Sequence, residues 1–314
     1  MSIEKLHCPD DATWHAARSK DVTASVAAAL LGAHEFETRL SLFMAKTGHA
    51  DLIEESEPMR RGRLLEPVAV QIIRERHPDW TIRYNNGSDR HYYRDAKARI
   101  GATPDIEVRD PERGFGVIQI KSVEGSVYRR KWANEDREPD PPVWIAVQAM
   151  IEATLTGATW AAVAPLVVGH GIDLPEIDIP LHTGIMARLR SEVADFWRRV
   201  AANDPPDPDF GRDGALIAAL YADDDGDMVD LSDNSRAIEL VAAREALKSR
   251  ESDGAAAAKE RKTIDAELIH ALGNAACGRL ADGRIIEAKT IRRDGYTVEP
   301  TSYRAVKIKE GKKS

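Results

Sequence analysis

Residues 101–122, GATPDIEVRDPERGFGVIQIKS, carry the pattern of a β-hairpin whose strands also hold ionisable and amide side chains. The segment DPERG at 110–114 predicts the turn, because proline fixes its φ angle and glycine readily adopts a left-handed backbone. A hairpin centred on Glu112 places Asp105 directly opposite Gln119. The stretch therefore predicts both a structural element and a pair of polar side chains that face each other.

The side chains of this hairpin alternate between two faces. One face is apolar and should belong to the core: Ile106, Val108, Ile118 and Ile120. The other face carries Asp105, Gln119 and Lys121, and cross-strand neighbours lie only about 5 Å apart. We expect these three polar groups to converge on one point.

Such a cluster suits the hydrolysis of a phosphodiester. Magnesium prefers hard oxygen ligands, which Asp105 and the amide of Gln119 offer, and the backbone carbonyl of Ile120 is a candidate further ligand. Lys121 would then orient the attacking water or stabilise the developing charge. The alternative is an exposed hairpin face on which aspartate and lysine only contact solvent.

The order of patterns along the chain predicts an α/β core. Helical patterns run to Arg76, and alternating segments follow from Trp80 to Lys121. A further helix then precedes two more strands, at 158–168 and 171–179. We expect a mixed central β-sheet flanked by helices.

A segment rich in proline and aspartate, NDPPDPDFGRD at 203–213, predicts the domain boundary. Residues 1–205 would form the first domain and residues 214–314 a C-terminal extension. A helical pattern over 235–272, which Gly254 interrupts, predicts a helical hairpin in this extension. An ADG turn and an RDG turn after it predict a small β-ribbon.

An acidic loop opens the extension. Asp223, Asp225 and Asp227 in YADDDGDMVD invite comparison with a calcium site. The glycine and the distant glutamate that an EF-hand requires are out of register, so we expect a solvated loop.

Composition limits the class of protein. Of 314 residues, 43% are hydrophobic, which supports a globular core, and Cys8 and Cys277 lie too far apart in sequence for a zinc motif. The net charge of -8 argues mildly against nucleic-acid binding, although basic runs such as RRKW at 129–132 allow local positive surface. The N-terminal sequence lacks the apolar run of a signal peptide, so we expect a soluble cytoplasmic protein without membrane spans.

Several motifs in order along the chain resemble one nuclease family. TPD at 103–105, followed by a strand that ends in QIK at 119–121, resembles the PD-(D/E)xK nuclease signature. The flanking segments are similar to those of the λ exonuclease or YqaJ-like recombinase family: WHAARSKDVTASVAAALLG, LSLFMAKTG, RGRLLEPVAV and VWIAVQAMIEATLTG. The resemblance covers residues 10–200 and implies a restriction-endonuclease-like core. It departs from the family at Gln119, where glutamate is usual.

The resemblance implies roles for residues in the hairpin and in two helices. Glu66 would join Asp105 and Gln119 in holding Mg²⁺ or, as an alternative, Mn²⁺. Gln148 would occupy the family's glutamine position and bridge a substrate phosphate or the lysine, and a side chain that only faces water is the alternative. Glu66 precedes Pro67, which cannot donate a backbone hydrogen bond, so the residues alone predict a helix start or a kink there. A plain helix-start glutamate favoured by the dipole is the alternative.

A second set of residues would contact DNA. Arg18 offers a forked donor and Ser25 should begin a helix, so together they would grip a terminal 5′-phosphate; a plain N-cap is the alternative for Ser25. Trp144, one helical turn before Gln148, belongs to the same set. Charges and aromatic rings mix in a segment that predicts a backbone-tracking and base-stacking surface: Tyr128, Arg129, Arg130, Lys131 and Trp132.

The function that the resemblance implies is a Mg²⁺-dependent exonuclease that digests double-stranded DNA from its ends, 5′ to 3′, and leaves single strands for phage-type recombination. It also implies a ring-shaped homotrimer, a single-strand annealing protein as partner, and the cytoplasm of a bacterium or of a phage-infected host cell. Two alternatives stay open. One is a nuclease-fold DNA-binding protein with weak or no activity, because of Gln119, and the other is an endonuclease of the same superfamily.

Overall fold

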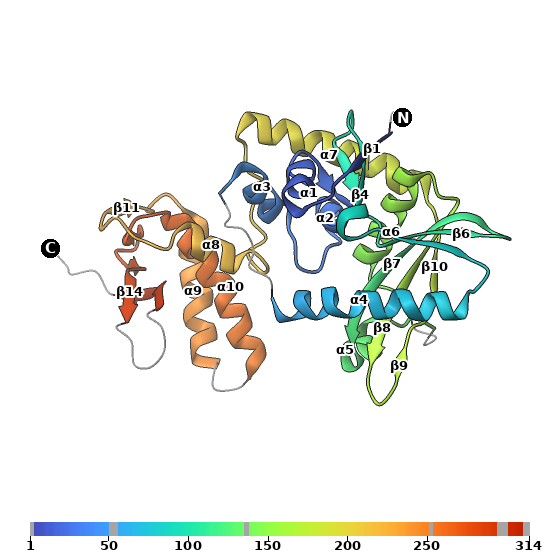
Figure 1. Cartoon of the computed structure of the whole chain (residues 1–314). Helices are drawn as coiled ribbons and strands as arrows, with labels where there is room; N and C mark the ends of the chain where they lie inside the picture. The colour runs from blue at the N-terminus through green and yellow to red at the C-terminus, as the bar shows by residue number, and fades with distance from the viewer. Residues whose placement is uncertain (1–2, 50–55, 135–137, 251–253, 294–300, 310–314) are drawn as a thin grey trace. The chain divides into compact units, whose positions relative to one another are not determined.

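The computed structural model describes residues 3–49, 56–134, 138–250, 254–293 and 301–309. The chain divides into two compact units, Met1–Pro206 and Asp207–Ser314 (Figure 1). None of the described helices is long and apolar enough to cross a lipid bilayer.

The first unit contains both helices and strands. Its helices are α1 (Asp11–Arg18), α2 (Ala24–Ala27), α3 (Arg39–Thr47), α4 (Glu57–Arg76), α5 (Gly125–Lys131), α6 (Val143–Thr156) and α7 (Thr183–Ala202), with the 3-10 turns η1 (Ala28–Leu31) and η2 (Gly87–Asp89). Its strands are β1 (Ile3–His7), β2 (Val22–Thr23), β3 (Thr81–Tyr84), β4 (His91–Asp95), β5 (Ile100–Ala102), β6 (Ile106–Asp110), β7 (Gly114–Glu124), β8 (Trp160–Val168), β9 (Ile172–Asp173) and β10 (Ile177–Ile179).

Strands β6 and β7 form the hairpin that the sequence predicts. They pair antiparallel with Ile106 opposite Ile118, which is the register obtained by centring the turn on Glu112. The Asp110 carboxylate accepts the Glu112 backbone N–H at 2.8 Å, and Gly114 has a φ of +80°. The turn chemistry sets the register, and the register decides which polar side chains meet.

The central sheet has the strand order β10-β8-β7-β6-β3, with β9 paired to β8. β7 and β8 run parallel, whereas the other neighbours in this order pair antiparallel. A parallel pair needs a crossover connection, and α5 and α6 lie in the connection between β7 and β8. The mixed sheet confirms the predicted α/β class.

Two helices cover the two faces of the central sheet (Figure 1). α4 packs on the apolar face that the hairpin pattern predicts: Ile106, Val108, Ile118 and Ile120. α6 packs on the opposite face, and its far side joins a separate cluster with α2, α3 and α7. α6 follows Pro142, and its C-cap is Gly157, which has a φ of +75°. The helix is therefore enclosed between the sheet and other helices.

A second sheet, in the order β1-β4-β5-β2, lies in the N-terminal part of the first unit. Its strand β5 leads into the TPD segment at 103–105. Trp14 of α1 donates its indole N–H to the hydroxyl of Thr103 at 2.9 Å. This contact ties α1 to the segment that ends in Asp105.

Helix α4 corrects one expectation. It begins at Glu57, with Ser56 as its N-cap, and continues through Pro67. Glu66 therefore lies inside a long helix, so of the two predicted positions, a helix start or a kink, the helix start was wrong. The apolar face that α4 buries on the sheet offsets the backbone hydrogen bond that proline cannot make.

The second unit combines helices with short strands. Its elements are α8 (Gly214–Leu220), β11 (Met228–Asp230), α9 (Ser235–Arg250), α10 (Ala255–Leu272), β12 (Cys277–Arg279), β13 (Ile285–Glu287), β14 (Thr290–Arg293), β15 (Thr301–Arg304) and β16 (Lys307–Lys309). α9 and α10 share one hydrophobic core, as a helical hairpin should.

The predicted β-ribbon of the second unit is part of a larger arrangement. A four-stranded sheet has the order β11-β12-β13-β16, and β14 pairs separately with β15. β11 precedes α9 and α10 in the chain and pairs parallel with β12, which follows them. The predicted ribbon of consecutive strands therefore did not include β11. The RDG turn predicted at 293–295 extends outside the described residues.

Candidate active site

Asp105 lies in the short segment between β5 and β6. Its carboxylate oxygen Oδ2 accepts the backbone N–H of Ile120 at 2.7 Å and also a side-chain N–H of Gln119. The hairpin therefore brings together the two residues that the sequence places opposite each other. Both of these hydrogen bonds go to Oδ2, and none to the second oxygen, Oδ1, is found among the described residues.

A chain of hydrogen bonds, here called the amide chain, links Lys121 to Asp105 through two glutamines. Lys121 Nζ donates to Gln148 Oε1 at 2.9 Å, and Gln148 Nε2 donates to Gln119 Oε1 at 2.7 Å. Gln119 Nε2 then donates to Asp105 and, at 3.0 Å, to the carbonyl of Ile120. Lysine has only donors, so it requires the oxygen of Gln148, and each later amide must follow the same direction. An N–H₂ group of Gln119, not its oxygen, therefore faces Asp105.

The structure adds Glu152, which the sequence patterns did not single out. It lies one turn after Gln148 on α6, is 0% exposed, and accepts an N–H from Gln148 Nε2 at 2.9 Å. Its other oxygen, Oε2, is buried without a hydrogen-bond partner among the described residues. Burial raises the pKa of Glu152 to about 8, so the acid holds its proton at neutral pH. A glutamate within the apolar helix VWIAVQAMIEATLTG was the signal that could have found it.

Glu66 of α4 belongs to the same electrostatic environment as Asp105. Burial raises the pKa of Glu66, and a hydrogen bond with Tyr84 and the charge of Lys121 oppose this rise. Burial raises the pKa of Asp105 well above its usual range, and the carboxyl groups of Glu66 and Glu152 raise it further when they are ionised. Burial also raises the pKa of Tyr84 to about 12. Perturbed carboxyl groups that act on one another are typical of functional sites.

The donor set suits a cation. Asp105 interacts electrostatically with Glu66, with Glu152 and with the ammonium group of Lys121, so ionising all the acids leaves a surplus of negative charge. A divalent cation would offset that surplus. Two residues beside the amide chain also keep a buried polar atom without a partner among the described residues: Trp144 Nε1 and Glu152 Oε2.

A cation here would need mixed ligands. In the described part of the chain, no group of three or more histidine, cysteine or acidic side chains is arranged to hold a metal ion. Asp105 and Glu66 would therefore need support from the Ile120 carbonyl, from amide oxygen or from water. Gln119 presents a donor at this point, so its oxygen reaches a cation only after its amide turns over.

Trp144 lies beside the amide chain. Its ring centre is 5.6 Å from Lys121 Nζ and 4.6 Å from the ring of His34. The ring of Phe36, which is 71% exposed, meets Trp144 edge-on at 6.1 Å. The exposed ring of Phe36 therefore contacts Trp144, which in turn lies beside Lys121.

Arg18 and Ser25 occupy different surroundings. Arg18 ends α1, and its guanidinium carbon lies 4.2 Å from the ring centre of Trp14, which bonds to Thr103. α2 starts one residue before Ser25, with Thr23 as N-cap, so Ser25 does not begin the helix. Ser25 Oγ and Thr23 Oγ1 share a hydrogen bond of 3.1 Å. Within the described residues, no hydrogen bond joins Ser25 to Arg18.

Helix α5 presents only part of the predicted basic and aromatic surface. Arg129 and Arg130 are exposed, whereas Lys131 forms an ion pair with Glu35. Trp132 is only 3% exposed, so the prediction that it stacks on bases was wrong. Its indole belongs instead to the cluster that α6 forms with the central sheet.

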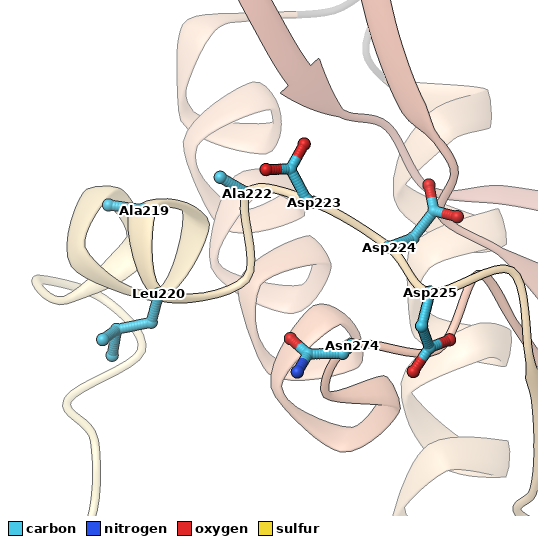
Figure 2. Close-up of a pocket in the computed structure, with 7 residues that line it drawn as sticks. All are labelled: Ala219, Leu220, Ala222, Asp223, Asp224, Asp225 and Asn274. Atoms are coloured by element: carbon cyan, nitrogen blue, oxygen red, sulfur yellow. The ribbon is translucent and has the colours of Figure 1, made fainter.

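The acidic loop of the second unit uses its carboxylates to hold its own backbone. Figure 2 shows Asp223 and Asp225 pointing to different sides of the loop. Asp225 accepts the backbone N–H of Asp227 at 2.9 Å, and Asp224 accepts the backbone N–H of Thr290 at 2.6 Å. These contacts are those of a structured turn rather than of a calcium cage.

Much of the first unit is similar to a known protein family. Residues 13–159 match the model of the YqaJ-like viral recombinase domain. This range contains the hairpin, α4 and α6, and hence every residue of the amide chain. A search of the curated proteins found no match.

Solved structures with partial similarity include two proteins that act on or bind nucleic acid by their descriptions. An alkaline exonuclease (LHK-Exo) from Laribacter hongkongensis shares 20% sequence identity, with 61% of this chain and 93% of that chain covered and a TM-score of 0.46. A SOX–DNA complex shares 11% identity, with 62% of this chain and 68% of that chain covered and a TM-score of 0.38.

Proposed function

Because residues 13–159 match the model of the YqaJ-like viral recombinase domain, we propose that this protein is a nuclease that degrades double-stranded DNA from its ends. The observation that carries the proposal is the amide chain, which joins Asp105 to Lys121 inside that domain. A carboxylate and an ammonium group held by one chain of hydrogen bonds can serve a single scissile phosphodiester.

Asp105 and Glu66, with the backbone carbonyl of Ile120, would hold Mg²⁺, or Mn²⁺ in its place. Their acidic and largely buried surroundings suit a hard cation that keeps some of its waters. A bound cation of this kind supplies charge stabilisation at the phosphate and lowers the pKa of a water. Gln119 would add its amide oxygen only after a half-turn of the amide, since its N–H₂ group faces Asp105.

The remaining residues of the site orient the substrate and the water. Lys121 would position the attacking water or offset the charge that develops on the phosphate, and Gln148 holds the ammonium group by a hydrogen bond of 2.9 Å. Trp144 lies beside that ammonium group, where its ring can support a sugar or a base next to the scissile bond.

The DNA end would be held away from the amide chain. Arg18 offers two N–H groups to a terminal 5′-phosphate, and its stacking on Trp14 limits the freedom of its side chain. Ser25 would add a hydroxyl donor. The basic residues of α5 would follow the sugar–phosphate backbone: Arg129, Arg130 and Lys131.

In this proposal digestion runs 5′ to 3′ and leaves single strands for phage-type recombination. A single-strand annealing protein would receive those strands in a bacterial or phage-infected cell. A ring-shaped homotrimer would enclose the duplex and keep the enzyme on it. The family resemblance supports these finer features.

A DNA-binding protein with weak or no cleavage activity is the second candidate, and Gln119 favours it. An amide can coordinate a cation but does not neutralise its charge. In addition, the N–H₂ group of Gln119 already occupies Asp105 Oδ2. An endonuclease of the same superfamily is a further alternative.

Digestion of end-labelled linear duplex, with and without a 5′-phosphate and with and without Mg²⁺, tests the proposal. We expect Mg²⁺-dependent shortening that starts at phosphorylated 5′ ends, and no cutting of closed circular DNA. Binding without shortening would favour the second candidate, and cut circles would favour an endonuclease.

A further inference from the structure

The buried carboxyl group of Glu152 has no part in the reaction proposed above. A polar group in a protein core costs free energy unless its hydrogen bonds are satisfied. Glu152 is 0% exposed, and its Oε1 accepts the N–H of Gln148 at 2.9 Å. Its Oε2 has no hydrogen-bond partner among the described residues. An apolar side chain of similar volume would avoid this cost, so the acid calls for an explanation.

The contacts of Gln148 suggest what Glu152 contributes. The amide oxygen of Gln148 accepts from Lys121, and its N–H₂ group meets two acceptors, Gln119 Oε1 and Glu152 Oε1. With both N–H groups used, the amide has one satisfied orientation. Without Glu152, one N–H would be left unpaired in the core, and the amide plane would lose one of the contacts that hold it.

We propose that Glu152 is a positioning residue whose carboxyl group fixes the amide of Gln148 and, through it, the direction of the amide chain that ends at Asp105. The activity part of this inference rests on the proposed function, whereas the structural part does not. The chain begins at Lys121 in β7, passes through Gln148 of α6, returns to β7 at Gln119 and ends before β6 at Asp105. It therefore couples the orientation of one helix to the carboxylate at the site.

The protonation state of Glu152 supports this role. Burial raises the pKa of the acid to about 8, so at neutral pH it accepts the Gln148 N–H without carrying a charge. The fixed amide of Gln148 also gives the side-chain amide of Gln119 a structural role. The amide oxygen of Gln119 accepts a hydrogen bond from Gln148, and its N–H₂ group donates one to the carboxylate of Asp105. The second hydrogen bond holds that carboxylate toward the site.

The glutamine content of the chain allows a direct test. The 314 residues include only three glutamines, Gln71, Gln119 and Gln148. Selective ¹⁵N-labelling of glutamine side chains therefore yields three pairs of N–H₂ signals, which Gln119→Glu and Gln148→Glu would assign. Gln71 is exposed on α4 and donates to Glu75 at 2.9 Å, so it serves as an internal control.

Glu152→Met should shift the signals of both Gln148 and Gln119, speed their hydrogen exchange by about ten-fold, and leave the Gln71 signals in place. Glu152→Gln, which can keep an oxygen toward Gln148, should preserve most of the wild-type pattern. An unchanged Gln119 signal in Glu152→Met would overturn the inference, because Glu152 would then not act along the chain. This measurement does not depend on nuclease activity.

The activity measurement completes the test. Glu152→Met should lower kcat by about ten-fold with KM for linear duplex unchanged within about two-fold, and Glu152→Gln should restore most of kcat. In a Gln148→Met background, Glu152→Met should have no further effect. Thr154→Val, which removes a hydroxyl bonded within α6 at 2.8 Å to the Met150 carbonyl, is the matched control and should keep wild-type activity.

The two proposals fail in different ways. If the wild-type protein digests no DNA, the proposed function is wrong, and the glutamine signals still decide the role of Glu152. If the wild type digests DNA and Glu152→Met does so equally well, the positioning role is wrong and the nuclease stands. Thermal unfolding of each variant shows whether a loss of activity is a loss of folded protein.

Discussion

Replacing Glu152 by glutamine should change how the free energy of unfolding depends on pH. Burial raises the pKa of Glu152 from 4.5 to about 8. In the unfolded chain the acid releases its proton near pH 4.5, whereas in the folded protein it holds the proton to about pH 8. Its contribution to stability is therefore fully present below the unfolded pKa and is lost as the pH rises through the folded pKa. Within that window each pH unit favours unfolding by about 1.4 kcal/mol.

The size of the effect follows from this slope. From pH 5 to pH 7 the wild-type protein should lose about 3 kcal/mol of stability relative to Glu152→Gln, whose amide does not titrate. Single domains are stable by roughly 5–15 kcal/mol, so this change is large enough to measure. The difference should level off near pH 8, where the folded protein also releases the proton.

Urea unfolding followed by circular dichroism at pH 5, 6, 7 and 8 measures the difference between wild type and variant. Glu112→Gln in the hairpin turn is the matched control. Its side chain is exposed, so its difference from wild type should stay within about 0.5 kcal/mol throughout. A Glu152→Gln difference that is equal at pH 5 and pH 7 would refute the reasoning, because burial would then not retain the proton.

Other predictions concern the site and the sheet that carries it. Asp105→Ala should abolish cleavage of linear duplex while gel-shift assays show DNA affinity within about three-fold of wild type; digestion at the wild-type rate would exclude this site. Gln119→Glu should retain or increase the affinity for Mg²⁺ in calorimetric titration, because a carboxylate adds negative charge, and a clear loss of affinity would count against a cation at this position. Arg18→Ala should remove the preference for 5′-phosphorylated over 5′-hydroxyl ends, measured as a ratio of initial rates; an unaltered ratio would contradict phosphate binding by this side chain. Gly116→Ala should lower the free energy of unfolding by about 1–3 kcal/mol, since the added Cβ would lie 2.0 Å from Trp160 Cε2, and an unchanged urea midpoint would show that the indole moves aside at little cost.

Part of the site could be predicted from the sequence because it depends on contacts that are local in the chain. The turn at 110–114 sets the hairpin register, and the register brings Gln119 against Asp105. Alternation also assigned the apolar face on which α4 packs. Local residues also bound α6, with Pro142 before it and Gly157 after it.

Other expectations failed or could not be formed because they depend on packing between distant segments. Glu66 lies inside α4, since burial of the helix on the sheet outweighs the hydrogen bond that Pro67 cannot make. Trp132 looked like part of a binding surface beside its basic neighbours, yet it is core. β11 joins its sheet by pairing with β12, and the helices α9 and α10 separate these two strands in the sequence.

The amino-acid sequence by itself determined the hairpin, its register and the meeting of an acid with an amide, because a turn and strict alternation leave one arrangement. Only the tertiary structure decided which way that amide points. Lys121, Gln148 and Glu152 come together when α6 packs on the sheet, and the hydrogen-bond donors and acceptors they bring set the direction. Hydrogen-bond direction belongs to a network of residues from different elements, so no single segment of the chain can specify it.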